Sequence, residues 1–285
     1  LPALLGEVDV LKTLQLLPGV QSGGEGQSGL YVRGGSPDQN LVLLDGVPVY
    51  NVSHLLGIFS VFNADAIKNV TLTKGGFPAR FGGRLSSVLE INMKEGNLQE
   101  FHGEGSIGLI SSKFSLEGPI KKGKTSFLLS GRRTYADLIF RPIINAFAQS
   151  EGIKTKIKAH FYDVNAKVQH KFNDKHRLFL SVYSGADVFF NKFEEDEDVF
   201  EGGIDWGNTI SALRWNYQIN NKLFANTTVT YSNYDINFLA ATEFNDGEDS
   251  ERFSAKYVSG IEDVGVKVDF DFIPFPNHYI RFGGG

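Results

Sequence analysis

The feature that most restricts the fold is a strict alternation of apolar and polar residues in the second part of the chain. Between residues 164 and 172, Val164, Ala166, Val168, His170 and Phe172 alternate with Asn165, Lys167, Gln169 and Lys171. The same period of two returns at 178–182, 213–219 and 266–272. This is the period of a β-strand with one apolar and one polar face. Two folds remain open: a soluble sandwich with apolar faces inward, and a membrane barrel whose polar faces line the lumen.

The lengths of the connections favour the barrel. We expect about nine strands, at residues 100–110, 112–119, 125–134, 160–172, 176–190, 206–219, 222–239, 256–272 and from 277 onward. Short turns at 121–124, 173–175, 220–221 and 274–276 then alternate with long loops at 135–159, 191–205 and 240–255. Short turns at one end and long loops at the other are typical of outer-membrane barrels. The short connection near Ser111 does not fit this pattern.

Aromatic residues near the predicted strand ends have two interpretations. They are Phe172, Trp206, Trp215, Tyr217, Tyr231 and Tyr234. In a membrane barrel such residues form a girdle at the lipid–water interface, whereas in a soluble β-protein they belong to the core. The order of turns and loops favours the girdle.

Composition excludes several classes of protein. No apolar run approaches the roughly 18 residues that a transmembrane helix needs. Cysteine is absent, which removes disulfides, thiolate catalysis and cysteine-ligated zinc. The six histidines are dispersed, so we expect no enzyme, no catalytic residue, no metal and no cofactor. The net charge of −5 argues against nucleic-acid binding. Acidic runs at 194–198 and 246–251 are expected to be solvated loops, with calcium binding as the alternative.

A different pattern occupies residues 30–94. Three short β-type runs, at 41–44, 70–73 and 88–91, are joined by glycine-rich turns, and each is predicted to be a strand buried on both faces. Upstream, Asp9 predicts the N-cap of a helix that continues to Leu17 and stops at Pro18-Gly19.

Four segments of this region, in their order and spacing, resemble the plug domain of TonB-dependent outer-membrane receptors. They are Val32-Arg33-Gly34-Gly35, then Val42-Leu43-Leu44-Asp45-Gly46-Val47-Pro48, then Asn69-Val70-Thr71-Leu72-Thr73-Lys74-Gly75-Gly76, and Ser87-Val88-Leu89-Glu90-Ile91. In that family the plug is a small α/β domain inside an antiparallel transmembrane β-barrel of about 22 strands. The resemblance implies a plug at 1–98 and the N-terminal part of a barrel at 99–285. About nine strands cannot close such a barrel, so we expect a larger receptor.

The resemblance also implies a function. Receptors of this family lie in the outer membrane of Gram-negative bacteria, capture a scarce nutrient at the extracellular face, and import it when TonB pulls on the plug. The implied partners are TonB, through a segment upstream of Leu1, outer-membrane lipid, the nutrient and, as an open option, a surface lipoprotein. The alternative is a structural or secretion component that holds or gates partner proteins without importing a small ligand. A siderophore, glycan, peptide or cobalamin would each fit the scaffold.

Three arginines are the predicted contacts between plug and barrel. Arg33, Arg80 and Arg84 stand beside Gly34-Gly35 and Gly82-Gly83, where the backbone can turn sharply. In the family, an arginine at the position of Arg33 pairs with barrel carboxylates, which a buried guanidinium requires. Asp45-Gly46 is predicted to be mainly an ordinary turn.

Five residues are the predicted ligand contacts. Two irregular plug segments, 36–39 and 50–54, are rich in hydrogen-bonding groups and are expected to face the extracellular side. They supply Asp38, Gln39, Tyr50, Asn51 and His54. The alternative is that both are plug turns packed against the barrel wall. In the first long loop, Thr134 and Asp137 match a capping box, which predicts a short helix interrupted at Pro142.

Overall fold

The computed structural model describes residues 3–4, 7–24, 29–150, 152–195, 198–246 and 249–285. Its N-terminal part is built on a four-stranded sheet in the order β6-β5-β10-β9. The strands are β5 (Asn40–Leu44), β6 (Val47–Pro48), β9 (Ile67–Lys74) and β10 (Ser87–Met93). β10 pairs with β5 in parallel and with β9 antiparallel. The three runs expected from the sequence are therefore neighbours in one sheet.

Short elements surround this sheet. They are β1 (Ala3–Leu4), β2 (Glu7–Val8), α1 (Val10–Leu14), β3 (Val20–Gln21), β4 (Tyr31–Val32), β7 (Ser53–His54), β8 (Phe59–Ser60) and the 3-10 turns η1 (Pro37–Gln39), η2 (Leu55–Gly57) and η3 (Ala64–Ala66). Together with the sheet they enclose a core that includes Leu11, Val32, Leu89, Ile91 and Met93.

The expectation that all three runs are buried on both faces is wrong for one of them. β5 and β10 are buried along most of their length, but β9 alternates between half-buried and exposed positions. β9 is the edge strand of the sheet, so only one of its sides has a neighbouring strand. The apolar run at 70–73 could not reveal which strand lies at the edge.

The first helix is shorter than expected. Asp9 caps it as predicted, because its Oδ1 accepts a hydrogen bond from the backbone N–H of Lys12 at 3.1 Å. The helix ends at Leu14, and the backbone N–H groups of Leu16 and Leu17 bond to carbonyls three positions back. The residue before a proline disfavours helical dihedrals, so the helix does not continue to Pro18.

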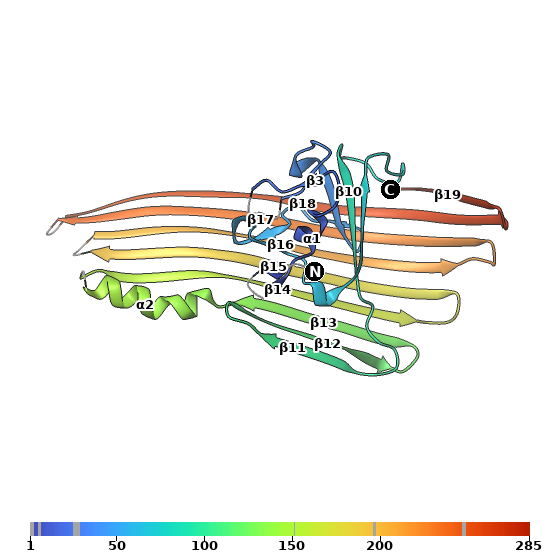
Figure 1. Ribbon diagram of the computed structural model, residues 1–285, viewed down its shortest axis with the longest axis horizontal. Helices are drawn as coiled ribbons and strands as arrows, with labels where there is room; N and C mark the ends of the chain where they lie inside the picture. Colours follow the sequence, from blue (N-terminus) through green and yellow to red (C-terminus); the bar gives the residue numbers. More distant parts are fainter. Residues whose placement is uncertain (1–2, 5–6, 25–28, 151, 196–197, 247–248) are drawn as a thin grey trace.

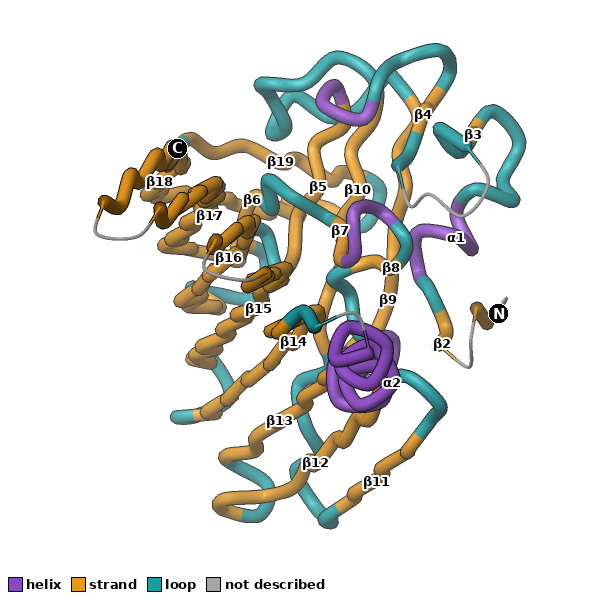
Figure 2. Tube along the Cα trace, turned by 90° about the vertical axis from the view of Figure 1, so that its left-hand side faces the viewer, coloured by secondary structure: helices purple, strands orange, loops and turns teal. Residues whose placement is uncertain are grey.

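The C-terminal part is a nine-stranded antiparallel sheet in which every strand pairs with its neighbours in the chain. The strands are β11 (His102–Ile107), β12 (Ser111–Lys121), β13 (Thr125–Thr134), β14 (Lys154–Lys171), β15 (His176–Glu195), β16 (Asp198–Gln218), β17 (Leu223–Asp246), β18 (Asp249–Phe275) and β19 (His278–Gly284). The sheet is curved, and the N-terminal part lies against one face of it (Figures 1 and 2). The predicted number and order of strands are both found.

Two of the predicted long loops are strands instead. Within them, residues 191–195, 198–205, 240–246 and 249–255 continue the ladders of β15–β16 and β17–β18. Their glycines and acidic residues are typical of loops, but continuous backbone hydrogen bonding between the paired strands outweighs this preference. These four strands are 20 to 27 residues long. A strand needs only about 9–11 residues to span a bilayer.

The third predicted loop contains the helix α2 (Ala136–Ser150), at the same end of the sheet as these extended hairpins (Figure 1). Pro142 lies inside the helix and does not interrupt it. The capping box does not form, because Thr134 belongs to β13 and its hydroxyl accepts a hydrogen bond from the backbone N–H of Phe161. Among the described residues, no helix is both long and apolar enough to cross a membrane.

Burial distinguishes the two folds that the alternating pattern had left open. Apolar side chains on one face of the nine-stranded sheet are exposed, among them Val164, Val168, Leu180, Val182, Leu213, Val229, Val264 and Val266. Polar side chains on the opposite face are buried against the N-terminal part, among them Asn165, Lys167, Gln169, Ser181, Asp187, Asn208, Thr228 and Ser232. A soluble sandwich has the reverse arrangement. The sheet therefore has the inverted pattern of a barrel wall.

The predicted aromatic girdle divides in two. Trp215 is 42% exposed and stacks on Tyr217 at the short-turn end, as an outward aromatic residue would. Trp206 is only 5% exposed and its indole N–H donates to the carbonyl of Ser53, so it faces inward. Tyr234, opposite Asn208 in the ladder, also points inward and hydrogen-bonds Asn51. For these two residues the interfacial prediction is wrong, because their positions in the strand have the inward parity.

Candidate functional site

The best-defined polar site is the contact between the segment 53–60 and strands β13–β15. His54 is 1% exposed and lies between two aspartates of the sheet. Its Nδ1 is 2.6 Å from Oδ2 of Asp187, and its Nε2 is 3.4 Å from Oδ2 of Asp163. The imidazole stacks on Phe161, with ring centres 4.1 Å apart. The other oxygen of Asp187 accepts the backbone N–H of Leu55 at 2.8 Å.

Arg132 completes this site. Its Nε and Nη2 donate to Oδ2 of Asp163 at 2.8 and 2.7 Å, and Nη2 also donates to the carbonyl of Ser60 at 2.8 Å. Two carboxylates and one guanidinium leave one negative charge uncompensated, which a protonated His54 would neutralise. Burial acts to lower the pKa of His54, but hydrogen bonds and charge interactions with Asp163 and Asp187 outweigh it and raise that pKa.

The Asp45-Gly46 turn forms a second charged contact. Both residues have positive φ, +50° and +88°, which is the geometry of a tight hairpin turn between β5 and β6. Oδ2 of Asp45 is 2.9 Å from Nζ of Lys167, and both side chains are at most 5% exposed. The same carboxylate accepts the backbone N–H of Met93, and Nη2 of Arg214 donates to the Asp45 carbonyl at 2.6 Å. The turn is present as predicted, and it is also ion-paired with the sheet.

A third set of contacts joins the N-terminal part to strands β16–β18. Tyr50 donates its hydroxyl to Oδ2 of Asp263 at 3.0 Å. Asn208 donates to the carbonyl of Asn51 at 2.7 Å, and Ser232 donates to the carbonyl of Pro48 at 2.8 Å. Beside these bonds is a cavity of about 480 Å³ between β5, β10 and the three sheet strands. On this side the contact is polar, and a cavity separates parts of the two surfaces.

The three arginines predicted to join plug and barrel lie in different surroundings. Arg33 has φ +50° and an exposed side chain, and among the described residues it forms no ion pair. Arg80 is 3.2 Å from Glu90 within the N-terminal part, and its carbonyl accepts Nζ of Lys267 from β18. Arg84 is half-buried and donates to the carbonyl of Gly83. Of the three, Arg80 is the one bonded to the sheet.

The five predicted ligand contacts separate into two groups. Asp38 is exposed and accepts the hydroxyl of Ser36, and the carbonyl of Gln39 accepts the N–H groups of Leu85 and Ser86. Tyr50, Asn51 and His54 are instead bonded to the sheet. His54 is the most enclosed of these three, because its imidazole lies between two carboxylates and against a phenyl ring, so its packing resembles the alternative of a plug turn against the barrel wall.

Several residues of this site were missed by sequence reasoning. They are Arg132, Asp163, Lys167, Asp187 and Arg214, all on the inward face of a strand. The signal was available in the polar half of each alternating run, where charged residues replace neutral ones. Among the described residues, no group of three or more histidine, aspartate or glutamate side chains is placed to hold a metal ion.

Comparisons with known proteins agree with this architecture. A family model described as the TonB-dependent Receptor Plug Domain matches residues 4–87. Solved structures are similar at low identity. The siderophore receptor PirA from Acinetobacter baumannii is 15% identical, with 96% of this chain and 58% of that chain covered and a TM-score of 0.46. The outer membrane transporter YddB from Escherichia coli is 12% identical, with 99% and 54% covered and a TM-score of 0.47.

The copper transporter OprC is 10% identical, with 93% of this chain and 49% of that chain covered and a TM-score of 0.51. The chain thus spans about half to three-fifths of the length of these three structures. The match at 4–87 covers the four-stranded sheet up to the first residue of β10, and the antiparallel sheet that follows has the inverted faces of a barrel wall. The chain therefore contains a region that matches the plug domain of TonB-dependent receptors, followed by a sheet with the fold of part of a β-barrel.

Proposed function

We propose that the protein is a TonB-dependent transporter of the Gram-negative outer membrane that imports a scarce nutrient. The nutrient binds at the end of the barrel where α2 and the long hairpins lie, and TonB, contacting a segment upstream of the plug, drives the plug to rearrange. We place the boundary between plug and barrel near residue 98, between β10 and β11.

The inverted burial of the nine-stranded sheet is the observation that carries this proposal. Buried polar side chains hold the plug on one face, while exposed Val, Leu and Phe side chains cover the other. Exposed apolar faces of this extent are stable in lipid and unstable in water. The charged plug contacts supply bonds that can break and re-form without exposing apolar surface, as a moving plug requires.

For the ligand site we propose Asp38, Gln39, Tyr50 and Asn51, with His54 beneath them. Tyr50 and Asn51 are half-buried, so each can contact a ligand while bonded to the sheet. His54 is fully enclosed and would act by fixing the position of this segment. Replacing His54 would therefore disturb docking and binding together, so ligand contacts are best tested at Asp38 and Gln39.

Uptake measurements test the proposal directly. A strain lacking the receptor, with and without the restored gene, is given labelled iron–siderophore, copper, cobalamin, oligosaccharide and peptide. We expect receptor-dependent uptake of one of them that a protonophore abolishes. Asp38→Ala with Gln39→Ala should reduce that uptake at unchanged surface abundance, while Lys122→Ala, in the turn at the opposite end, should not.

The alternative, a plugged barrel that serves as a structural or secretion component, predicts a different result. No member of the panel would then enter in a receptor-dependent, energised manner, and a partner protein would co-purify with the receptor in fixed stoichiometry. That combination of results would replace the transport proposal. A surface lipoprotein that co-purifies while uptake persists is compatible with transport.

A further inference from the structure

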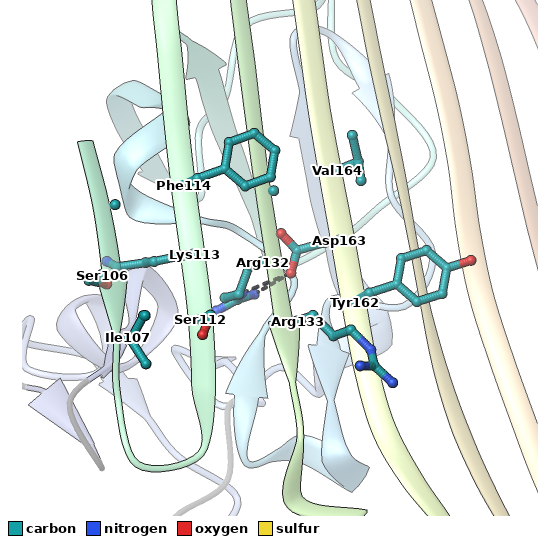
Figure 3. A pocket seen from close by; sticks show the side chains of 12 residues that line it. Ser106, Ile107, Ser112, Lys113, Phe114, Arg132, Arg133, Tyr162, Asp163 and Val164 are labelled. Carbon is teal, nitrogen blue, oxygen red and sulfur yellow. Dashed lines mark hydrogen bonds and ion pairs between the residues drawn. The ribbon is translucent and has the colours of Figure 1, made fainter. Parts of the chain in front are cut away.

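A hollow of about 820 Å³ lies on the outward face of β11–β14, on the side away from the plug (Figure 3). Across these strands the ladder aligns Gly105, Phe114, Gly131 and Val164, so glycine alternates with a bulky apolar residue. A side chain added at Gly131 would meet the Phe114 ring at 2.6 Å, so the ring leans across the glycine. The ring therefore covers Gly131, and the hollow beside it is a groove bordered by the apolar side chains of Ile107, Phe114 and Val164.

Two residues farther along the strands, a positively charged side chain borders the groove. The next row of the ladder contains Ser112, Arg133 and Tyr162, with Ile107 on β11. Figure 3 shows the Arg133 side chain extending away from Ile107 and Ser112, beside Tyr162. Arg133 is exposed, and among the described residues it has no ion-pair partner. The apolar groove therefore ends at an unpaired cation.

Two further cations continue the same face of β14. The next position after Tyr162 on this face is His160, which is half-buried with its Nδ1 3.4 Å from Oδ2 of Asp137 in α2. Lys158 and Lys156 follow at alternate, exposed positions, and in the part of the chain that the structure describes neither lysine forms an ion pair. The ammonium of Lys158 lies 5.9 Å from the ring centre of Phe190. Lys158 is about 13 Å along the strand from Tyr162, at about 3.3 Å per residue. Long side chains from Arg133 and Lys158 can approach one ligand of that size.

Arg133 and Lys158 lie at the depth expected for lipid headgroups, at the edge of the apolar band of the sheet. Outward residues of β14 from Phe172 to Tyr162 are mainly apolar and exposed, and both ends of this run are aromatic. Ten residues span about 33 Å along the strand, or about 23 Å of membrane depth at a tilt of about 45°. The apolar band of an outer-membrane barrel is about 25 Å tall. Arg133 lies at the upper edge of this band and Lys158 lies above it, at the end where α2 is found.

We propose that this groove binds a phosphate-bearing membrane lipid, with an acyl chain against Phe114 and Val164 and the phosphate between Arg133 and Lys158. The proposal rests on the membrane location proposed above. Charge complementarity selects the occupant, because two unpaired cations at the end of an apolar groove match an anionic headgroup on a hydrocarbon chain. An acidic peptide would match the cations but not the groove, which lies within the lipid-facing band.

Binding of a defined lipid to the full receptor in detergent tests the site. The probe is dioleoyl phosphatidic acid, and dioleoylglycerol, which lacks the phosphate, is its matched control. We expect Arg133→Glu with Lys158→Glu to weaken binding of the phosphatidic acid roughly 20-fold or more, since each cation near a membrane surface contributes several-fold to the affinity for anionic lipid. Lys122→Glu with Lys124→Glu, two exposed cations at the opposite end of the sheet, should leave binding unchanged. Val164→Trp, which fills the groove, should weaken binding without altering charge.

Three results would overturn the inference. They are equal binding by the Arg133/Lys158 and Lys122/Lys124 variants, equal binding of the two lipids, and displacement of the lipid by inorganic phosphate alone, which would identify a free-anion site. Nutrient uptake is measured separately in the same variants. Loss of lipid binding with normal uptake supports the lipid site, and absence of uptake in the wild type would reject only the transport proposal.

Discussion

The plug contacts the barrel wall on two sides that differ in chemistry. Toward β13–β15 the contact is buried and ionic: Asp163 and Asp187 are at most 1% exposed, and Arg132 is 4% exposed. Toward β16–β18 it consists of single hydrogen bonds, such as Tyr50 to Asp263, around a cavity of about 480 Å³. There, Nε of Arg214 and Oδ1 of Asn226 are buried without a hydrogen-bond partner among the described residues.

This difference indicates which side holds the plug. Removing one member of a buried ion pair leaves a charge that is costly to bury, so the β13–β15 side resists separation and fixes the position of the plug. Single hydrogen bonds beside a cavity can be replaced by bonds to water at little cost. We therefore expect the plug to open first along β16–β18 and to remain attached longest at His54 and Arg132.

The largest effect should come from Arg132→Met. The substitution leaves Asp163 buried without its guanidinium, and the free energy of opening the plug should fall by about 3–5 kcal/mol. Amide hydrogen exchange of residues 53–62 in the full receptor measures this. The control is Arg80→Met, which removes a pair whose side chains are 28–29% exposed and should cost less than about 1 kcal/mol. Equal exchange in the two variants would mean that the buried ion pair of Arg132 does not hold the plug.

A smaller effect should follow from pH, through His54. Its pKa is raised when the plug is docked, so its contribution is fully present below the free imidazole value of about 6.5 and is lost as pH rises through the docked value. The charged groups that face His54 are Asp163, Asp187 and Arg132. Protection of residues 53–62, corrected for intrinsic exchange rates, should decrease toward alkaline pH, and His54→Gln should flatten the curve. The same slope in His54→Gln would assign the effect to another group.

The smallest effect should come from Tyr50→Phe, on the open side. The change removes one hydrogen bond to Asp263, worth about 1 kcal/mol, and leaves an aspartate that water in the neighbouring cavity can solvate. Exchange should rise in residues 47–52 and stay constant in residues 53–62. If both segments changed together, the plug would open as one unit, and the distinction between a fixed and an open side would not hold.

Much of the fold was predictable, because the alternation of residues 164–172 requires a strand and the Asp45-Gly46 turn requires a hairpin. The continuation of the strands through 191–195, 198–205, 240–246 and 249–255 was not, since pairing between long strands overrides the local preference of glycine and acidic residues. Whether β9 would be an edge strand also depends on sheet order, which a single run does not encode.

The site was less predictable than the fold. His54 was identified from its position in an irregular plug segment, but its partners Asp163 and Asp187 are more than 100 residues away in sequence. The alternating pattern places both aspartates on the polar face without indicating which plug residue each one meets. Arg33 illustrates the opposite case, in which a conspicuous Arg-Gly-Gly sequence lies on an exposed turn within the described part of the chain.

The contact between His54 and Asp187 also constrains the order of assembly. The two residues are 133 positions apart, and Tyr50 and Asp263 are 213 positions apart. The hydrophobic core of the plug, in contrast, lies within residues 10–93, and only a few inward residues of the sheet pack against it. Contacts of low sequence separation form before those that require closure of a long loop. We therefore expect the plug to gain its own core first and to receive the histidine's partners only after strand β15 has been added. Docking is then a late step, and the barrel wall is built around a plug that is already folded.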